Sequence, residues 1–186
     1  MGLIAKLLQF TRTVANGAKT SDVKADPGGG AIKTAQNFQS ANTDANPLPN
    51  DFVLFVHVQG AGKHSAAGYV DPQNLQSAQP GEWRAYARDP ESGEQVAQTW
   101  VMNDGAVLTE NGNGTHMLFP DGAQTMQNAN GYIKLLASGV VDINGYIIGL
   151  DGNGTTAAGV SQDGHTHAQG PDSAGNTQAE TEAPAQ

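Results

Sequence analysis

Apolar residues in the first part of the chain fall in short runs that are separated by longer polar loops. Five of these runs have the length of β-strands: 4–14, 20–26, 31–38, 51–59 and 65–71. The run that includes residues 52–58, Phe-Val-Leu-Phe-Val-His-Val, is the strongest of them. Such near-continuous apolar character is typical of a strand that is buried on both faces, so we expect its far side to be covered.

Five short strands within about 90 residues fit a small Greek-key barrel of the OB type. They fit a generic β-sandwich about equally well, and the pattern alone leaves both architectures open. A polar stretch rich in Gln, Pro and Ser follows at 72–81, and the next predicted strand lies at 82–87.

From residue 104 onward the chain is punctuated by Asp-Gly and Asn-Gly pairs, which are strong turn signals because both residues tolerate positive φ. The pairs begin at Asp104, Asn111, Asn113, Asp121, Asn130, Asn144, Asp151, Asn153 and Asp163. Short β-rich pieces lie between them, at 96–102, 106–109, 115–119, 131–136, 139–143 and 146–150. Their spacing is too uneven to predict a strict repeat.

These later strands carry too few apolar side chains to bury a core within one chain. Three chains wound around a shared axis would bury the alternate inward residues and remove the free sheet edges. A monomeric meander of hairpins is the alternative. The residues after His167 include no apolar run, which predicts a flexible or surface-bound tail.

Composition excludes several classes of function. The chain has 24 Gly and only 6% aromatic residues, which favours turn-rich β structure. A net charge of −9, with nine Lys and Arg in all, argues against nucleic acid as a partner. We read no secretory signal and no membrane span, and therefore expect a chain that is soluble when made. Because Cys is absent, His and carboxylates are the only strong metal ligands.

The segment His165-Thr166-His167 is the one feature that points to specific chemistry. On a strand, residues i and i+2 face the same side, so both imidazoles would point one way. Three such strands at a threefold axis would bring six imidazole nitrogens together, which suits an octahedral ion such as iron and not tetrahedral zinc. A chance pair of His is the alternative. The His pair lies between the turn-rich region and the polar tail, and this position favours a metal site. Few apolar residues are available there to hold the ends of the three chains together, and metal bonds could do so instead.

No motif in the sequence predicts catalysis. We find no nucleophile elbow, zinc-protease motif or paired carboxylates on a recognisable scaffold, and we expect no enzyme. A metal-dependent hydrolase that uses the His pair is a further alternative, but it needs an open coordination position and six imidazoles leave none. The segment 151–155 has too few acidic ligands for calcium, so Asn153 is expected to be a plain turn residue.

These features, in this order, resemble the central spike or baseplate assembly protein of contractile phage tails, in particular the phage Mu-like branch. The resemblance covers most of the chain. It rests on the strand at 51–58, on Pro-Gly-Glu-Trp-Arg-Ala-Tyr at 80–86, on the glycine-punctuated strands, and on Gly-His-Thr-His at 164–167. The loop at 39–50 and the 19 residues after His167 depart from the family pattern.

The resemblance implies an all-β chain with three parts: an OB-fold barrel at 1–95 that docks on the baseplate hub protein, an intertwined trimeric β-helix shaft at 96–160, and a metal-binding apex with a polar tail at 161–186. It also implies an iron ion on the threefold axis, bound by His165 and His167 of all three chains, with Thr166 as a spacer.

The function implied is mechanical. Sheath contraction would drive the homotrimer into the host outer membrane, which it contacts transiently. We therefore expect a virion protein at the baseplate tip of the tail, made in the host cytoplasm. The main alternative is a monomeric OB-type module that binds carbohydrate or protein and carries a disordered tail.

Overall fold

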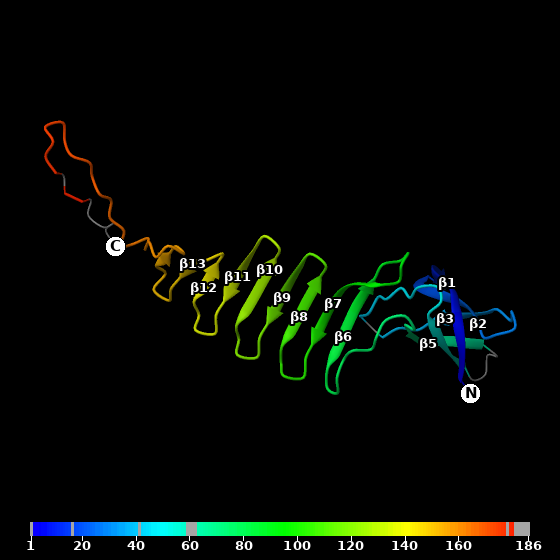
Figure 1. Ribbon diagram of the computed structural model, residues 1–186. Helices are drawn as coiled ribbons and strands as arrows, with labels where there is room; N and C mark the ends of the chain where they lie inside the picture. The colour runs from blue at the N-terminus through cyan, green and yellow to red at the C-terminus, as the bar shows by residue number, and fades with distance from the viewer. Residues whose placement is uncertain (1, 16, 41, 59–62, 178, 181–186) are drawn as a thin grey trace. The chain divides into compact units, whose positions relative to one another are not determined.

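The computed structural model describes residues 2–15, 17–40, 42–58, 63–177 and 179–180. Every regular element in these residues is a β-strand, which confirms the predicted all-β class (Figure 1). No helix in them is long and apolar enough to cross a membrane. The chain divides into two compact units, one formed by residues 1–76 with 88–94 and the other by 77–87 with 95–186.

The first unit is a closed barrel of five strands in the order β1-β2-β3-β5-β4. The strands are β1 (Gly2–Ala15), β2 (Ala18–Asp26), β3 (Lys33–Asn37), β4 (Phe52–Val58) and β5 (Lys63–Val70). All five strands predicted for this part of the chain are present. Neighbouring strands pair antiparallel except β3 and β5, which pair parallel.

The barrel core is built from alternate residues of the strands. Leu7, Val23, Val53 and Phe55 are its largest fully buried side chains, and alanines from β1, β2, β3 and β5 fill the space between them. The outward residues of β4, Phe52 and Leu54, are each 42% exposed. The expectation that β4 is buried on both faces is therefore wrong for the single chain. Its apolar run is continuous because its outer positions are apolar too, and not because a second layer of this chain covers them.

The second unit contains a single nine-stranded sheet in sequential order, from β6 to β14 (Figure 1). Its strands are β6 (Trp83–Arg88), β7 (Gln95–Val101), β8 (Val107–Asn111), β9 (Gly114–Leu118), β10 (Gln124–Asn128), β11 (Gly131–Leu135), β12 (Val141–Ile143), β13 (Tyr146–Ile148) and β14 (Gly154–Thr155). From β7 onward all neighbours pair antiparallel. The sequence did not predict β10 and β14, since β10 has Met126 as its single large apolar residue and β14 has none.

The turns along one edge of this sheet form a regular series. Gly105, Gly122 and Gly139 all have positive φ and are spaced 17 residues apart. Each turn is closed by the same two backbone hydrogen bonds, of which Met102 N to Ala106 O and Gly105 N to Met102 O are the first example. The next glycine of the series, Gly152, follows after 13 residues. Gly159 closes a turn with the same two bonds at the opposite edge, after β14. The repeat that the sequence did not predict is therefore present. It was hidden because Asx-Gly pairs of both edges are interleaved along the chain and because the turn at Gly139 has Ser138 before its glycine.

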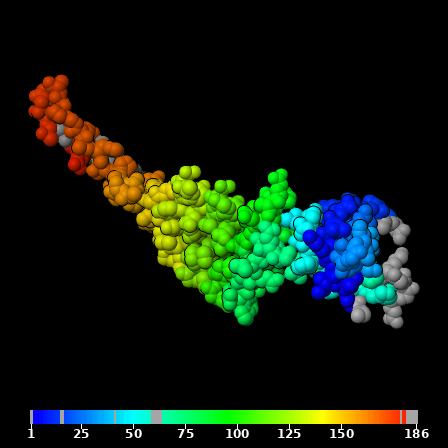
Figure 2. Space-filling model, turned by 45° about the vertical axis from the view of Figure 1, so that its right-hand side comes forward, coloured from blue at the N-terminus to red at the C-terminus, as the bar shows by residue number. Residues whose placement is uncertain are grey.

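The shortening of the repeat makes the sheet narrow toward its C-terminal end. Strand length falls from seven residues in β7 to five in β8–β11, three in β12 and β13, and two in β14. Figure 2 shows the same narrowing within this unit, from green through yellow to orange. Because a strand rises about 3.3 Å per residue, the loss of five residues narrows the sheet by roughly 16 Å.

The two faces of the sheet differ in chemistry. Directly paired residues lie on the same face, so the pairing register assigns each side chain to one side. What we call the apolar face carries Val101, Val107, Leu118, Met126, Ile133, Leu135, Val141, Ile143 and Ile148. No paired position on this face holds Asp, Glu, Lys or Arg. The opposite face mixes apolar residues with Glu110, Lys134 and Asp142.

The apolar face has no second layer within the described chain. Ile133, Ile143 and Leu135 are 43%, 39% and 36% exposed, and Ala106 is the one buried hydrophobic residue among the described residues of this unit. A sheet normally buries its apolar face against another layer. The backbone pairing of these strands is complete within one chain, whereas the burial of their side chains is not.

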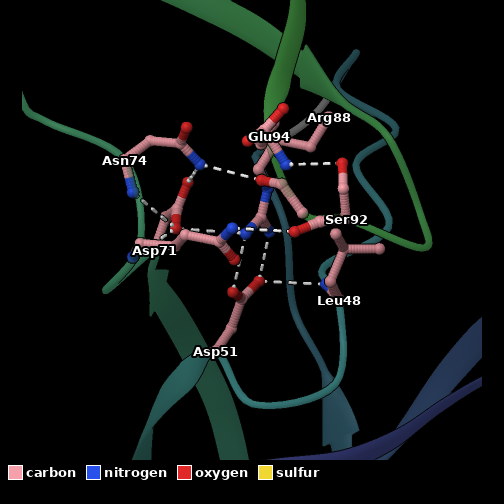
Figure 3. Close-up of polar contacts among 9 residues, drawn as sticks. Leu48, Asp51, Asp71, Asn74, Arg88, Ser92 and Glu94 are labelled. Carbon is pink, nitrogen blue, oxygen red and sulfur yellow. Dashed lines mark hydrogen bonds and ion pairs between the residues drawn. The ribbon is translucent and has the colours of Figure 1, made fainter.

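The first unit also holds a nearly buried ionic cluster (Figure 3). Arg88, the last residue of β6, donates to both carboxylate oxygens of Asp51, with 2.9 Å between Nη1 and Oδ1, and its Nη1 lies 3.1 Å from Oδ1 of Asp71. The side chains of Arg88, Asp51 and Asp71 are only 12%, 4% and 11% exposed. Asp51 also accepts from the backbone N of Leu48, and Asp71 from the side chain of Asn74. Within the first unit, one cation therefore ties the segment 88–94 to the loop before β4 and to the end of β5.

We expect Arg88→Ala to destabilise the barrel by about 3 to 5 kcal/mol, because it leaves two buried carboxylates without their cation. Amide hydrogen exchange in β4 would measure the loss. Arg12→Ala is the matched control, since Arg12 pairs with Asp44 at 3.0 Å but the two side chains are 63% and 73% exposed. That substitution should cost less than about 1 kcal/mol. Equal effects of the two substitutions would show that burial of the cluster contributes nothing.

Candidate metal centre

The predicted ligands His165 and His167 follow the narrow end of the sheet. The last bridged residue before them is Ser161, which pairs with Thr155 of β14. The described structure has no strand at 165–167, so the strand geometry expected for this segment is absent from the single chain. The two imidazoles are nevertheless neighbours, because their ring centroids lie 5.0 Å apart with the planes at 86°.

The orientation of His165 is set by backbone carbonyls. Its Nδ1 lies 2.9 Å from the carbonyl oxygen of Gln162 and 3.1 Å from that of Ser161. A carbonyl oxygen can only accept, so Nδ1 carries a hydrogen, and in the neutral imidazole Nε2 is the nitrogen that has the lone pair. A neutral imidazole whose other nitrogen is held in this way is the usual form of a histidine metal ligand.

A polar network holds the turn that supplies those carbonyls. The Asn153 side chain donates to Oγ of Ser161 at 2.9 Å and accepts from the backbone N of Asp163 at 3.3 Å. Oγ of Ser161 accepts from the backbone N of Gly164 at 3.2 Å. Tyr146 reaches the same turn, where its hydroxyl donates to the side chain of Gln162 at 2.9 Å. Sequence reasoning missed this support: it interpreted Asn153 only as a turn residue and did not single out Ser161.

The chain after His167 doubles back toward the His pair. Residues 172–176 form a turn in which the backbone N of Gly175 donates to the carbonyl of Asp172 and Asp172 N donates to Asn176 O. Hydrogen bonds from the Asn176 side chain, and then from its backbone, lower the pKa of Asp172. The hydroxyl of Thr166 donates to the carboxylate of Glu180 at 3.2 Å. Thr166, expected to be only a spacer, therefore contacts the returning tail, and the residues after 180 lie outside the described part.

The donor set of one chain fits only part of a metal site. Within the described residues, no group of three or more His, Asp or Glu is close enough to hold an ion. Octahedral first-row ions take six ligands and structural zinc takes four. Among the described residues, the two imidazoles therefore supply only part of either ligand set, and further chains or water would have to supply the rest.

The remaining His residues lie elsewhere. His57 and His64 pair across β4 and β5, and their ring centroids lie 5.5 Å apart. The ring of His64 also packs edge-on against that of Phe55, with 6.2 Å between the two centroids. His64 is thus half-buried against a core residue. His116 is exposed on the apolar face of the sheet.

No family model matches the chain, and no curated protein matches it either. The observations that bear on function are therefore the barrel, the narrowing sheet with its apolar face, and the His pair at its end.

Proposed function

We propose that this protein is the central spike at the tip of a contractile phage tail, a homotrimer that pierces the host outer membrane when the sheath contracts. The observation that carries the proposal is an uncharged apolar face on a sheet that narrows toward a pair of histidines. One chain leaves this face uncovered. Three copies around an axis would bury it and bring the narrow ends together in a point.

The proposed trimer also completes the metal site. Three copies supply six imidazoles at the narrow end, a number that fits an iron ion on the threefold axis. Because the last strands have only two or three residues, little apolar burial can hold the ends together there. Metal bonds would replace that burial and stiffen the tip.

The barrel at the other end of the chain is proposed to be an OB-fold that docks on the hub protein of the baseplate. Its closed five-stranded arrangement and the strand order β1-β2-β3-β5-β4 support this reading. The mature protein would then reside at the baseplate tip of the virion. The proposed role is mechanical and involves no catalytic step.

Native mass measurement together with metal analysis of the purified full-length protein tests the proposal. We expect three chains in the particle and one iron ion per three chains, in keeping with six-coordinate binding. A stable monomer at micromolar concentration would contradict the trimer and the shared site, and would favour the monomeric OB-type binding module. A trimer with two imidazoles and water on the metal would favour a hydrolytic site instead.

A further inference from the structure

We propose that Asn153 is a positioning residue for the metal ligand His165. Through Ser161 it holds the turn whose carbonyl groups orient the imidazole with Nε2 directed to the metal. This inference rests on the metal centre of the proposed function, and it assigns a role to a residue that does not itself bind the ion.

Asn153 is suited to this role because its own backbone is held in a tight turn after β13. Its backbone N donates to the carboxylate of Asp151 at 3.0 Å, and its carbonyl accepts from the backbone N of Gly149 at 3.0 Å. Gly152, inside this turn, has a φ of 82°, which favours glycine. The side chain of Asn153 therefore starts from a defined position.

From that position the amide contacts the next turn at two points. Nδ2 donates to Oγ of Ser161 at 2.9 Å, and Oδ1 accepts from the backbone N of Asp163 at 3.3 Å. Ser161 in turn accepts from Gly164, the residue directly before the ligand. These contacts join the residues on both sides of Gln162, so one side chain defines the path of the turn.

The turn determines where the imidazole points. Nδ1 of His165 donates to the carbonyl groups of Ser161 and Gln162, and the backbone N of Gln162 is fixed to Gly154 O at 2.7 Å. If the turn relaxes, both carbonyl groups move away from Nδ1. The Nδ1–H tautomer of His165 is then no longer favoured over the Nε2–H tautomer. Such supporting contacts typically change metal affinity by about 10- to 100-fold, because they set both the ring orientation and the tautomer of the ligand.

The chemistry of the side chain predicts how substitutions will rank. Asn153 donates and accepts at once, whereas Asp could only accept and Ala could do neither. Asn153→Asp keeps the acceptor for Asp163 N and for the Ser161 hydroxyl, which lies 3.2 Å from Oδ1, and loses the Nδ2 donor. We therefore expect it to lie between the unsubstituted protein and Asn153→Ala.

The test uses the full-length protein and two measurements. Competition between the protein and a chelator for ferrous iron should show about 10- to 100-fold weaker binding in Asn153→Ala. Long-range proton–nitrogen NMR of the metal-free protein should show His165 as the Nδ1–H tautomer in the unsubstituted chain and as a mixture in the variant. Asn176→Ala is the matched control, since the Asn176 amide donates to Asp172 in the tail. This substitution should change neither the affinity for iron nor the tautomer of His165.

Retention of the Nδ1–H tautomer in Asn153→Ala would overturn the inference, as would loss of the trimer, which would make Asn153 a structural residue of the sheet. If the unsubstituted protein binds no iron, the metal centre of the proposed function fails. The tautomer measurement on the metal-free protein still decides whether Asn153 positions His165.

Discussion

Replacing Ile133 by lysine is expected to dissociate the trimer into monomers at micromolar concentration. Ile133 lies in the middle of the apolar face, paired with Met126 of β10 and Ile143 of β12. In the proposed trimer this face is buried against the other chains, and an ammonium group would be buried there without a partner. Removing one ammonium group from water costs several kcal/mol of association free energy, and each of the three chains contributes one such group. Native mass spectrometry would measure the outcome.

Ile147→Lys is the matched control for this substitution. Ile147 is an isoleucine with the same exposed fraction, 43%, but it lies on the opposite face, next to Asp142. A lysine there can reach water and a carboxylate, so the trimer should persist. If both variants stay trimeric, or if both dissociate, the apolar face is not the interface between the chains.

Replacing both His165 and His167 by alanine is expected to remove all bound iron while the trimer stays assembled. The metal bonds lie at the narrow end, after the last two-residue strand. The apolar face extends over the whole sheet from β7 to β13, and its burial is worth roughly 25 cal/mol per Å². Most of the association free energy should therefore come from the sheet, and the metal should contribute stiffness and local stability at the tip.

Metal analysis and native mass on the same sample would check this expectation. His57→Ala with His64→Ala is the matched control, because those two rings are also close neighbours, with centroids 5.5 Å apart, but lie in the barrel. The control should keep its iron. Loss of the trimer together with the metal in the tip variant would show that the metal holds the chains together, and unchanged iron content would exclude the His pair as the ligands.

The sequence was sufficient to place the strands of the barrel. Each of them has apolar residues at alternate or successive positions, such as Val23 and Ala25 in β2, and lies between Gly, Pro or polar turn residues. Local composition therefore marks both ends. It failed at β4, where apolar residues on both faces predicted burial on both sides. Phe52 and Leu54 are apolar but face outward, and only the closed barrel shows which alternate set lies inside.

Local signals were weaker in the sheet of the second unit. β10 contains Gln, Thr, Met, Gln and Asn, and becomes a strand because β9 and β11 pair with it on both sides. The 17-residue period was also hidden, since the Asx-Gly pairs of the two sheet edges are interleaved and the turn at Gly139 lacks such a pair. Strand pairing separates the two series of turns.

The sequence by itself determined that this chain is all-β and that His165 and His167 are its candidate ligands, because alternation, turn residues and the spacing of two imidazoles are local properties. Only the tertiary structure showed that the apolar side chains of the sheet share one uncharged face and that the sheet narrows toward the His pair. Only the tertiary structure brought Asn153 and Ser161 to the turn that orients His165. These features depend on strand register and on contacts between separate turns, which no local pattern of residues specifies.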